Sequence, residues 1–283
     1  MCVFFFNIKQ LGNKDMNNIF SVDNSDNNRI YICSDSIEGI FTAIYDIYTH
    51  VAAKETTHDK CKIITGEIGN YELFSEYIDV VTDSEKALKV TKTICERFGF
   101  EAYETFLYAA ACDDDRKATA IYKSIVTGFK LKDKFKLINM WTDPNVALVN
   151  ELRRKAGNEF ARWREFLQFK ELNNKTLFSR IGPVCDILML LAPHFANRLP
   201  NENFMIYDEI RDKYLVHEIG KPCVIVIGDG QDPDEDNIRS SDDVVSEDLF
   251  KVFTSSIAIK ERENHKLQQQ LMPLRIQKYK IEF

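Results

Sequence analysis

Two short runs in the second half of the chain alternate apolar and polar residues, and this period of two constrains the fold more than any other feature. Residues 204–208 read FMIYD and residues 214–217 read YLVH, with the polar turn Arg211-Asp212-Lys213 between them. Side chains of a strand point to alternate faces of a sheet, so each run suits a strand with one buried face. The sequence therefore predicts a β-hairpin over residues 204–217.

A second predicted hairpin precedes the first one. Residues 166–172 and 176–181 are rich in apolar side chains and flank the polar turn Asn173-Asn174-Lys175. This arrangement is typical of antiparallel strands joined by a short turn. Residues 222–227 read PCVIVI and add one more strand. We therefore expect a mainly antiparallel sheet.

The segment that joins the two hairpins reads PVCDILMLLAPHFANR and predicts a helix with a break. Asp186 is a suitable N-cap for an apolar run that ends at Leu191. Pro193 lacks a backbone N–H and clashes with the preceding turn, so the helix is expected to kink or restart there. In a new turn from Pro193, His194 and Arg198 stand four residues apart and lie on one face.

The first half of the chain is mostly helical by pattern. Asp143 followed by Pro144 is a strong start signal for a long helix that runs to Trp163 or Phe166, and Gly99 is typical of a helix end. The predicted elements of this half are strands at 29–33 and 61–64 and helices at 37–51, 84–98, 101–112 and 113–131, the last with the acidic run 113–115 as its first turn.

These elements predict an α+β fold in which a helical block packs on the sheet as a single compact unit. The seven cysteines form no CxxC pair, and no stretch is long and apolar enough for a membrane span. We therefore expect a cytosolic protein without a membrane partner. The predicted regions are an N-terminal extension at 1–28, a helix-rich region at 34–165, a sheet-rich region at 166–228, an acidic loop at 229–245 and a C-terminal helical region at 246–283.

Positive charge is concentrated in one part of a chain whose formal net charge is −7. Residues 116–180 hold 15 Lys or Arg against 6 Asp or Glu, many of them on the long helix beside an apolar stripe that contains Trp163. One interpretation is a phosphate-binding surface. The other is a solvated helix whose arginines pair with Glu151, Glu159 and Glu165. The candidate phosphate ligands are Arg153, Arg154, Arg162, Arg164 and Lys170, with Arg262 in a second basic stretch that also contains Arg275 and Lys278.

Three blocks of the chain resemble a bacterial family described as putative DNA metabolism or DNA repair proteins. They read YICSDSIEGIFTAIYDIY, HFANRLPNENFMIYDEIR and FTSSIAIKERENHKLQQQLMP, and they fall in this order between residues 29 and 283. The resemblance implies a radical-SAM protein as partner and a relation to the domain attached to a uracil-DNA-binding protein of the uracil glycosylase superfamily. Together with the local positive charge, it leads us to expect a DNA-binding accessory protein of DNA repair.

The alternative is an enzyme that acts on nucleic acid or nucleotides. The chain has no Gly-rich nucleotide fingerprint, no phosphate-binding loop and no HExxH motif, and we predict neither a cofactor nor a metal. An acid–base site would have to form where the broken helix packs over the hairpin. The competing interpretation is a buried hydrogen-bond network that ties Arg198, Asn201 and Asn203 to the turn backbone. The candidate catalytic residues are His194, Arg198, Tyr207, Asp208 and His217.

Overall fold

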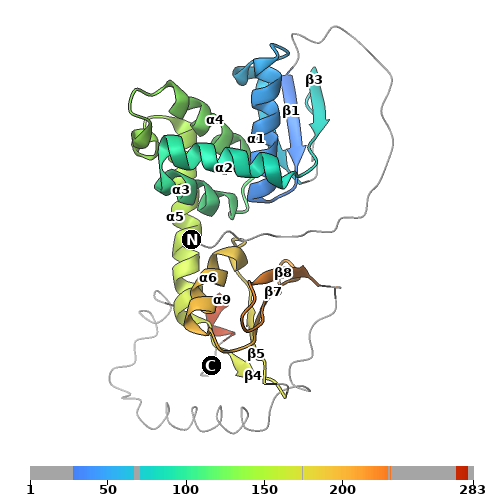
Figure 1. Cartoon of the computed structure of the whole chain (residues 1–283), viewed down its shortest axis with the longest axis vertical. Helices are drawn as coiled ribbons and strands as arrows, with labels where there is room; N and C mark the ends of the chain where they lie inside the picture. Colours follow the sequence, from blue (N-terminus) through green and yellow to red (C-terminus); the bar gives the residue numbers. More distant parts are fainter. Residues whose placement is uncertain (1–27, 67–70, 174, 229, 231–271, 280–283) are drawn as a thin grey trace. The chain divides into compact units, whose positions relative to one another are not determined.

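The computed structural model describes residues 28–66, 71–173, 175–228, 230 and 272–279. Their contacts divide them into an N-terminal unit that ends at Gly157 and a C-terminal unit that begins at Asn158. The boundary falls inside helix α5 (Pro144–Phe166), which continues through it without interruption (Figure 1). The chain therefore forms two compact units rather than the single unit that the sequence predicts, and a helix connects them.

The N-terminal unit contains a three-stranded parallel sheet. Its order is β2-β1-β3, in which β1 (Asn28–Cys33) pairs with both β2 (Cys61–Thr65) and β3 (Ser75–Asp79). Helix α1 (Ile37–Ala52) returns the chain between β1 and β2, which is the kind of crossover that a parallel pair requires. The two predicted strands of this half are confirmed, whereas the sequence pattern does not predict β3.

Helices α2 (Ser84–Phe98), α3 (Phe100–Ala110) and α4 (Lys117–Lys130) form a group next to α1 (Figure 1). Two 3₁₀ helices, η1 (His58–Lys60) and η2 (Lys134–Asn139), precede β2 and α5. Asp83 caps α2 by accepting backbone N–H bonds, and Gly99, with a φ of 91°, ends it. Asp143 caps α5 in the same way. The predicted end at Gly99 and the predicted start at Asp143 are confirmed.

One predicted helix start in this unit is wrong. The acidic run at 113–115 is expected to begin a helix, but α4 begins only at Lys117. Lys117 is buried, and its Nζ lies 2.6 Å from Asp35 Oδ1 and donates to the Cys112 carbonyl oxygen at 2.6 Å. A buried ammonium group needs such partners, so the side chain of Lys117 anchors the start of α4 beside the loop that follows β1.

The C-terminal unit contains a five-stranded mixed sheet with the order β4-β5-β6-β7-β8. Both predicted hairpins are present, as the antiparallel pairs β4–β5 and β6–β7, but β5 and β6 run parallel. The α+β class is confirmed, whereas the expectation of a mainly antiparallel sheet is wrong, because one sheet is parallel and the other mixed. The strands are β4 (Lys170–Glu171), β5 (Leu177–Ile181), β6 (Phe204–Asp208), β7 (Lys213–His217) and β8 (Val224–Ile227).

Helix α6 (Leu188–Arg198) supplies the crossover that makes β5 and β6 parallel. It is one helix with Pro193 inside it, so the chain does not restart a new helix at Pro193 as one of the two predicted outcomes requires. Its N-cap is Ile187, without a side-chain cap bond, and the predicted cap Asp186 pairs with a lysine instead. The buried face of α6 packs on the sheet, where the ring centroids of Phe195 and Phe204 lie 6.5 Å apart.

A short part of the C-terminal region is described, with helix α9 (Leu274–Gln277) after Pro273. Most of the predicted acidic loop and of the predicted C-terminal helical region lies outside the described residues, as does nearly all of the predicted N-terminal extension. The six cysteines of the described part are free thiols. No helix described here combines the length and hydropathy needed to span a bilayer.

Candidate functional site

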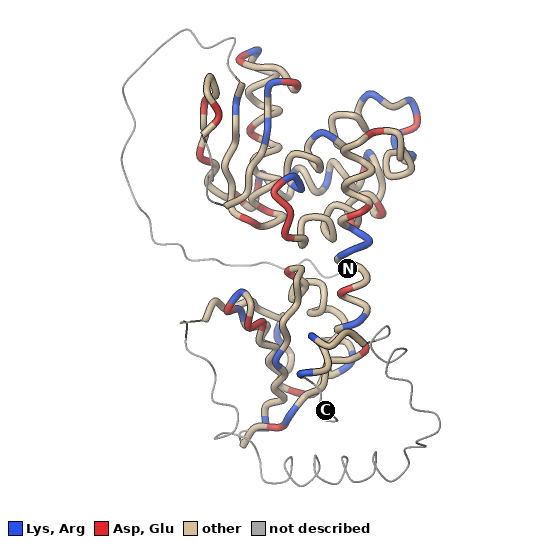
Figure 2. Tube along the Cα trace, turned by 180° about the vertical axis from the view of Figure 1, so that it is seen from behind, with Lys and Arg blue, Asp and Glu red and all other residues tan. Residues whose placement is uncertain are grey.

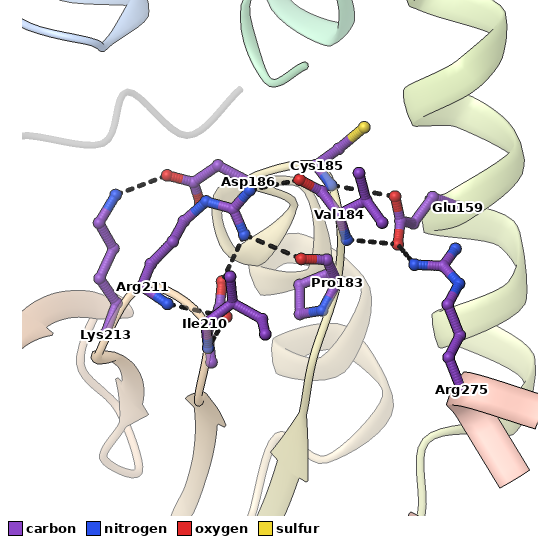
Figure 3. A network of polar contacts seen from close by, with 10 residues as sticks. Glu159, Pro183, Val184, Cys185, Asp186, Ile210, Arg211, Lys213 and Arg275 are labelled. Carbon is purple, nitrogen blue, oxygen red and sulfur yellow. Dashed lines mark hydrogen bonds and ion pairs between the residues drawn. The ribbon is translucent and has the colours of Figure 1, made fainter. Parts of the chain in front are cut away.

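The carboxyl ends of β5 and β6 lie at the same edge of the mixed sheet because the two strands are parallel. Their last residues, Ile181 and Asp208, are partners in the register. Open sheets commonly carry functional groups at such an edge. The loop at 182–187 and the turn at 209–212 leave the sheet here, and their polar groups form the network in Figure 3.

Asp208 is the most deeply buried carboxylate of this network, with 0% exposure. It alternates with Phe204 and Ile206 on one sheet face. Its Oδ1 accepts backbone N–H bonds from Ile210 (3.0 Å) and Arg211 (3.3 Å), and its Oδ2 lies 3.1 Å from Arg211 Nη1. Burial raises the pKa of Asp208, and the Arg211 guanidinium opposes that rise. The carboxylate thus closes the turn between β6 and β7.

The Arg211 guanidinium connects this turn to the loop after β5. Besides the carboxylate, it donates to the carbonyl oxygen of Pro183 at 3.0 Å and to that of Val184. A second link joins Lys213 Nζ to Asp186 Oδ2 at 2.6 Å. Arginine presents five N–H donors in a planar fork, so one side chain is able to hold a carboxylate and two carbonyl groups together.

Glu159 of α5 holds the same loop from the side of the long helix (Figure 3). Its side chain is 4% exposed, and its oxygens accept backbone N–H bonds from Val184 (2.7 Å) and Cys185 (3.0 Å). Arg275 Nη1 of α9 lies 2.7 Å from Glu159 Oε1. Burial alone would raise the pKa of Glu159, but the two backbone donors and Arg275 outweigh it and lower the pKa. Glu159 therefore does not serve as the partner of arginines along α5 that the solvated-helix interpretation requires.

The polar groups of this network bond to one another: its buried carboxylates accept hydrogen bonds from backbone N–H and guanidinium groups. Among the described residues, no three His, Cys, Asp or Glu side chains gather in a way that could hold a metal ion. Buried polar groups that are fully bonded fix one conformation. This buried network is not the one predicted from Arg198, Asn201 and Asn203, because Asp208, Arg211, Glu159 and Arg275 form it. Its geometry supports a structural role, the fastening of α5, α9 and the two loops to one another.

A comparison with models of protein families identifies the family of this chain. The family model described as a domain of unknown function, DUF4130, matches residues 115–282, which is more than half of the chain. The chain belongs to the DUF4130 family. No curated protein matches it. The DUF4130 match contains every residue of the network, whereas the first resembling block, at 31–48, lies before it. What the match shows is membership of this domain family.

In this DUF4130 protein, the alternative catalytic residues do not converge. Asp208 pairs in the register with Lys213 and His217 with Phe204, so the two candidates lie at opposite ends of the hairpin. At about 3.3 Å per residue, they are about 13 Å apart along the strands. Tyr207 points to the other sheet face, where its ring stacks on a second tyrosine at 4.5 Å between centroids. The structure therefore does not form one acid–base site from Asp208 and His217.

His194 and His217 share one unusual feature, a buried ring Nε2 that has no hydrogen-bond partner in the described part of the chain. Burial lowers the pKa of His194, and the positive charges of Arg164 and Arg198 lower it further. His217 lies in the core, with its ring 4.8 Å from that of Phe204. Among the five catalytic candidates, His194 and Arg198 lie one helical turn apart on α6.

The candidate phosphate ligands differ in how far they reach solvent and in the unit that holds them. Arg262 lies outside the described residues. Trp163, which sits among them on α5, is buried as predicted. The exposed candidates are Arg153 and Arg154 in the N-terminal unit and Arg164 in the C-terminal unit, and the half-buried ones are Arg162 and Lys170 in the C-terminal unit.

Sequence reasoning misses the residues that organise this sheet edge. Arg275 and Lys278 are interpreted from sequence as parts of a basic tail, but they pair with Glu159 and Glu209 at 2.7 Å each. The role of Arg211 has one local signal, the aspartate three residues before it, since aspartate often accepts N–H bonds from a turn that follows it. The other contacts join residues far apart in the chain and leave no trace in a local pattern.

Proposed function

We propose that this DUF4130 protein is a DNA-binding accessory protein of DNA metabolism or repair. The observation that carries the proposal is the run Arg153, Arg154 and Lys155, three consecutive exposed cations on α5 in the N-terminal unit. Figure 2 shows Lys and Arg mixed with Asp and Glu over much of the described chain, with this run as a continuous basic stretch on the long helix. Three cations within one helical turn spread positive charge around this part of α5, and Lys and Arg are the side chains that neutralise phosphates in nucleic-acid complexes.

These cations are available to phosphate groups. The acidic partner of Arg153 is Glu104, at an N–O distance of 4.0 Å, and both side chains are exposed. Such a pair contributes between about 0 and 1 kcal/mol, so its loss costs little when a phosphate replaces the carboxylate. Arg154 and Lys155 have no carboxylate within 4.0 Å in the described part of the chain. In the C-terminal unit, Arg164 lies 3.9 Å from Glu165, its neighbour on the helix, and its guanidinium lies over the ring of Phe160 at 5.7 Å.

The proposal is tested by fluorescence anisotropy of labelled single-stranded, duplex and uracil-containing oligonucleotides across a salt series. Contact with about four to six phosphates predicts a log–log salt slope between about −3 and −5 and little sequence preference. Arg154→Glu should weaken binding to every oligonucleotide and reduce the magnitude of the slope by about 1. Lys92→Glu on α2 is the matched control, because Lys92 is exposed and undergoes the same charge reversal. Absence of binding at low salt, or equal effects of the two reversals, contradicts the proposal.

The family resemblance adds a partner to this proposal. A radical-SAM protein accompanies the resembling family, and we propose that the present protein also acts with one. Co-expression and pull-down after nuclease treatment test a direct contact between the two proteins. Failure to associate at micromolar concentration counts against it.

A second candidate function is an enzyme that acts on nucleic acid or nucleotides, centred on His194. The observation in its favour is the buried Nε2 of His194, which has no partner among the described residues. A ring kept neutral by burial and by nearby cations is in the form that a general base needs. A screen of damaged nucleotides and DNA compares the wild type with His194→Ala. Turnover that survives in the variant removes this candidate.

A further inference from the structure

The N-terminal unit exposes three large aromatic side chains in and around η2. Phe100 is 68% exposed, and Phe135 and Trp141 are each 64% exposed. Phe135 packs on Gly99, the residue before Phe100, so Phe100 and Phe135 are close in the fold, and Trp141 follows the end of η2 by two residues. Aromatic rings each have about 150–250 Å² that folding or binding usually removes from water. Several rings left exposed in one region indicate a surface that a partner covers.

Lysines lie on both sides of Phe135 in the chain. Residues 130–136 read KLKDKFK, with four lysines and one aspartate. The aspartate, Asp133, lies 3.4 Å from Lys136. Lys130, Lys132 and Lys134 have no carboxylate partner within the described ranges. The segment therefore combines aromatic surface with positive charge that the described part of the protein does not neutralise.

Positive charge extends from this segment to the neighbouring end of α4. Burial and the charges of Lys123 and Lys130 lower the pKa of His58, which lies near both lysines. Burial lowers the pKa of Lys123 as well; the charge of Asp59 opposes this shift, and Lys130 adds to it. Cations that disfavour one another's charge create a local potential that attracts an anion.

The core beneath η2 holds this surface in one conformation. Leu137 of η2 is buried. The ring of Phe135 lies over Gly99, 3.2 Å from the place that a Cβ atom would occupy. The carbonyl oxygen of Ile138 accepts a 2.8 Å bond from Asn150 Nδ2 of α5. A surface that is already ordered loses little conformational entropy when a ligand binds.

We propose that a surface formed by Phe100, Lys130, Lys132, Lys134, Phe135 and Trp141, the η2 surface, binds single-stranded nucleic acid. The lysines contact phosphates, and the rings stack on bases. Base faces are open to aromatic side chains where a strand is unpaired, whereas a duplex could use the lysines alone. The inference rests on the proposed DNA binding and deepens it, because it names unpaired strands as the ligand and assigns them a surface of their own.

Trp141 provides a direct readout of this binding. The chain has two tryptophans, and Trp163 is buried in the C-terminal unit. Titration of the full-length protein with oligo(dT) should quench the emission of Trp141, because a base stacks on the indole ring, and Trp141→Phe should abolish the quenching. Phe135→Ala should weaken oligo(dT) binding about tenfold and leave duplex affinity unchanged. Phe74→Ala is the matched control, since Phe74 is an exposed phenylalanine of the same unit outside this segment.

The outcomes separate this inference from the proposed function. The η2 inference is overturned, and the proposed function stands, if Arg154→Glu weakens all binding while Phe135→Ala changes none. It is also overturned if oligo(dT) binds without quenching Trp141. No binding of any oligonucleotide overturns both proposals. Poly-glutamate that quenches Trp141 as strongly as oligo(dT) would overturn the inference as well, because the ligand would then be an acidic protein segment.

Discussion

Replacing Glu159 by glutamine should destabilise the C-terminal unit by about 3 kcal/mol. Glutamine keeps the shape of the side chain but offers one neutral acceptor where the carboxylate offers two charged ones. One of the backbone N–H groups of Val184 and Cys185 then faces an NH₂ group, and a buried donor left unsatisfied costs about 1–3 kcal/mol. The other N–H group and Arg275 lose a charged partner, which adds about 1 kcal/mol.

Unfolding by guanidinium chloride, followed by tryptophan fluorescence in a Trp141→Phe background, measures this change. Trp163 then reports alone, one helical turn beyond Glu159, with its ring 5.3 Å from that of Tyr279. Glu165→Gln is the matched control on the same helix, because Glu165 is exposed and its contact to an arginine is 3.9 Å long. The control should change the free energy of unfolding by less than about 0.5 kcal/mol. A Glu159→Gln effect no larger than this would refute the account of the network as a set of buried, satisfied charges.

The destabilisation should also depend on pH. The pKa of folded Glu159 lies below its ordinary value of 4.5, so its contribution to stability is complete above pH 4.5 and is lost as the pH falls through the folded pKa. The difference in free energy of unfolding between wild type and Glu159→Gln should therefore shrink on acidification below that value. A constant difference down to about pH 3 would mean that the charge of Glu159 contributes nothing.

Three further changes test other parts of the structure by chemical unfolding. Gly39→Ala should cost at least about 2 kcal/mol, because its Cβ would lie 2.5 Å from the backbone oxygen of Ser34; an unchanged midpoint would contradict that close approach. Gly157→Ala should instead stabilise the protein by up to about 1 kcal/mol, since the nearest neighbouring atom is 4.0 Å from the new Cβ, and a loss of stability would show hidden crowding. His58 has a pKa lowered from 6.5 by burial and nearby lysines, so stability should fall as the pH drops from 6.5 through the folded pKa. His58→Gln should flatten this part of the pH profile, and an identical slope in the variant would count against the assignment.

Helix and strand positions were predictable where the deciding interaction is local. Asp83 and Asp143 accept N–H bonds two and three residues ahead of them, and Gly99 adopts a positive φ that glycine tolerates. Such signals lie within one turn of the element that they start or end. The predicted bounds of these two helices therefore agree with the observed bounds of α2 and α5.

Strand pairing was less predictable because it depends on where the segment between two strands returns the chain to the sheet. Pro193 removes one backbone donor, but α6 packs its buried face on the sheet and remains continuous. Tertiary packing thus outweighs the local effect of proline, and the uninterrupted helix carries the chain back to a parallel neighbour.

The candidate site was predictable as a region but not in its contacts. The stretch from Pro183 to His217 does hold the polar network, yet Asp208 and His217 are separated by the length of a hairpin. Glu159 reaches Val184 and Cys185 across 25 and 26 residues and Arg275 across 116. Only the fold brings these groups together, so residue spacing could not reveal them.

Helix α5 belongs to both compact units, with its first fourteen residues in one and its last nine in the other. Isolated helices shorter than about 12–15 residues are marginal in water, so each half gains from the nucleus that the other provides. The DUF4130 match, which begins at residue 115, also takes in both halves of this helix. Gene fusion or recombination at the unit boundary would cut the helix in two. We therefore expect a split gene or a shuffled domain to keep α5 whole.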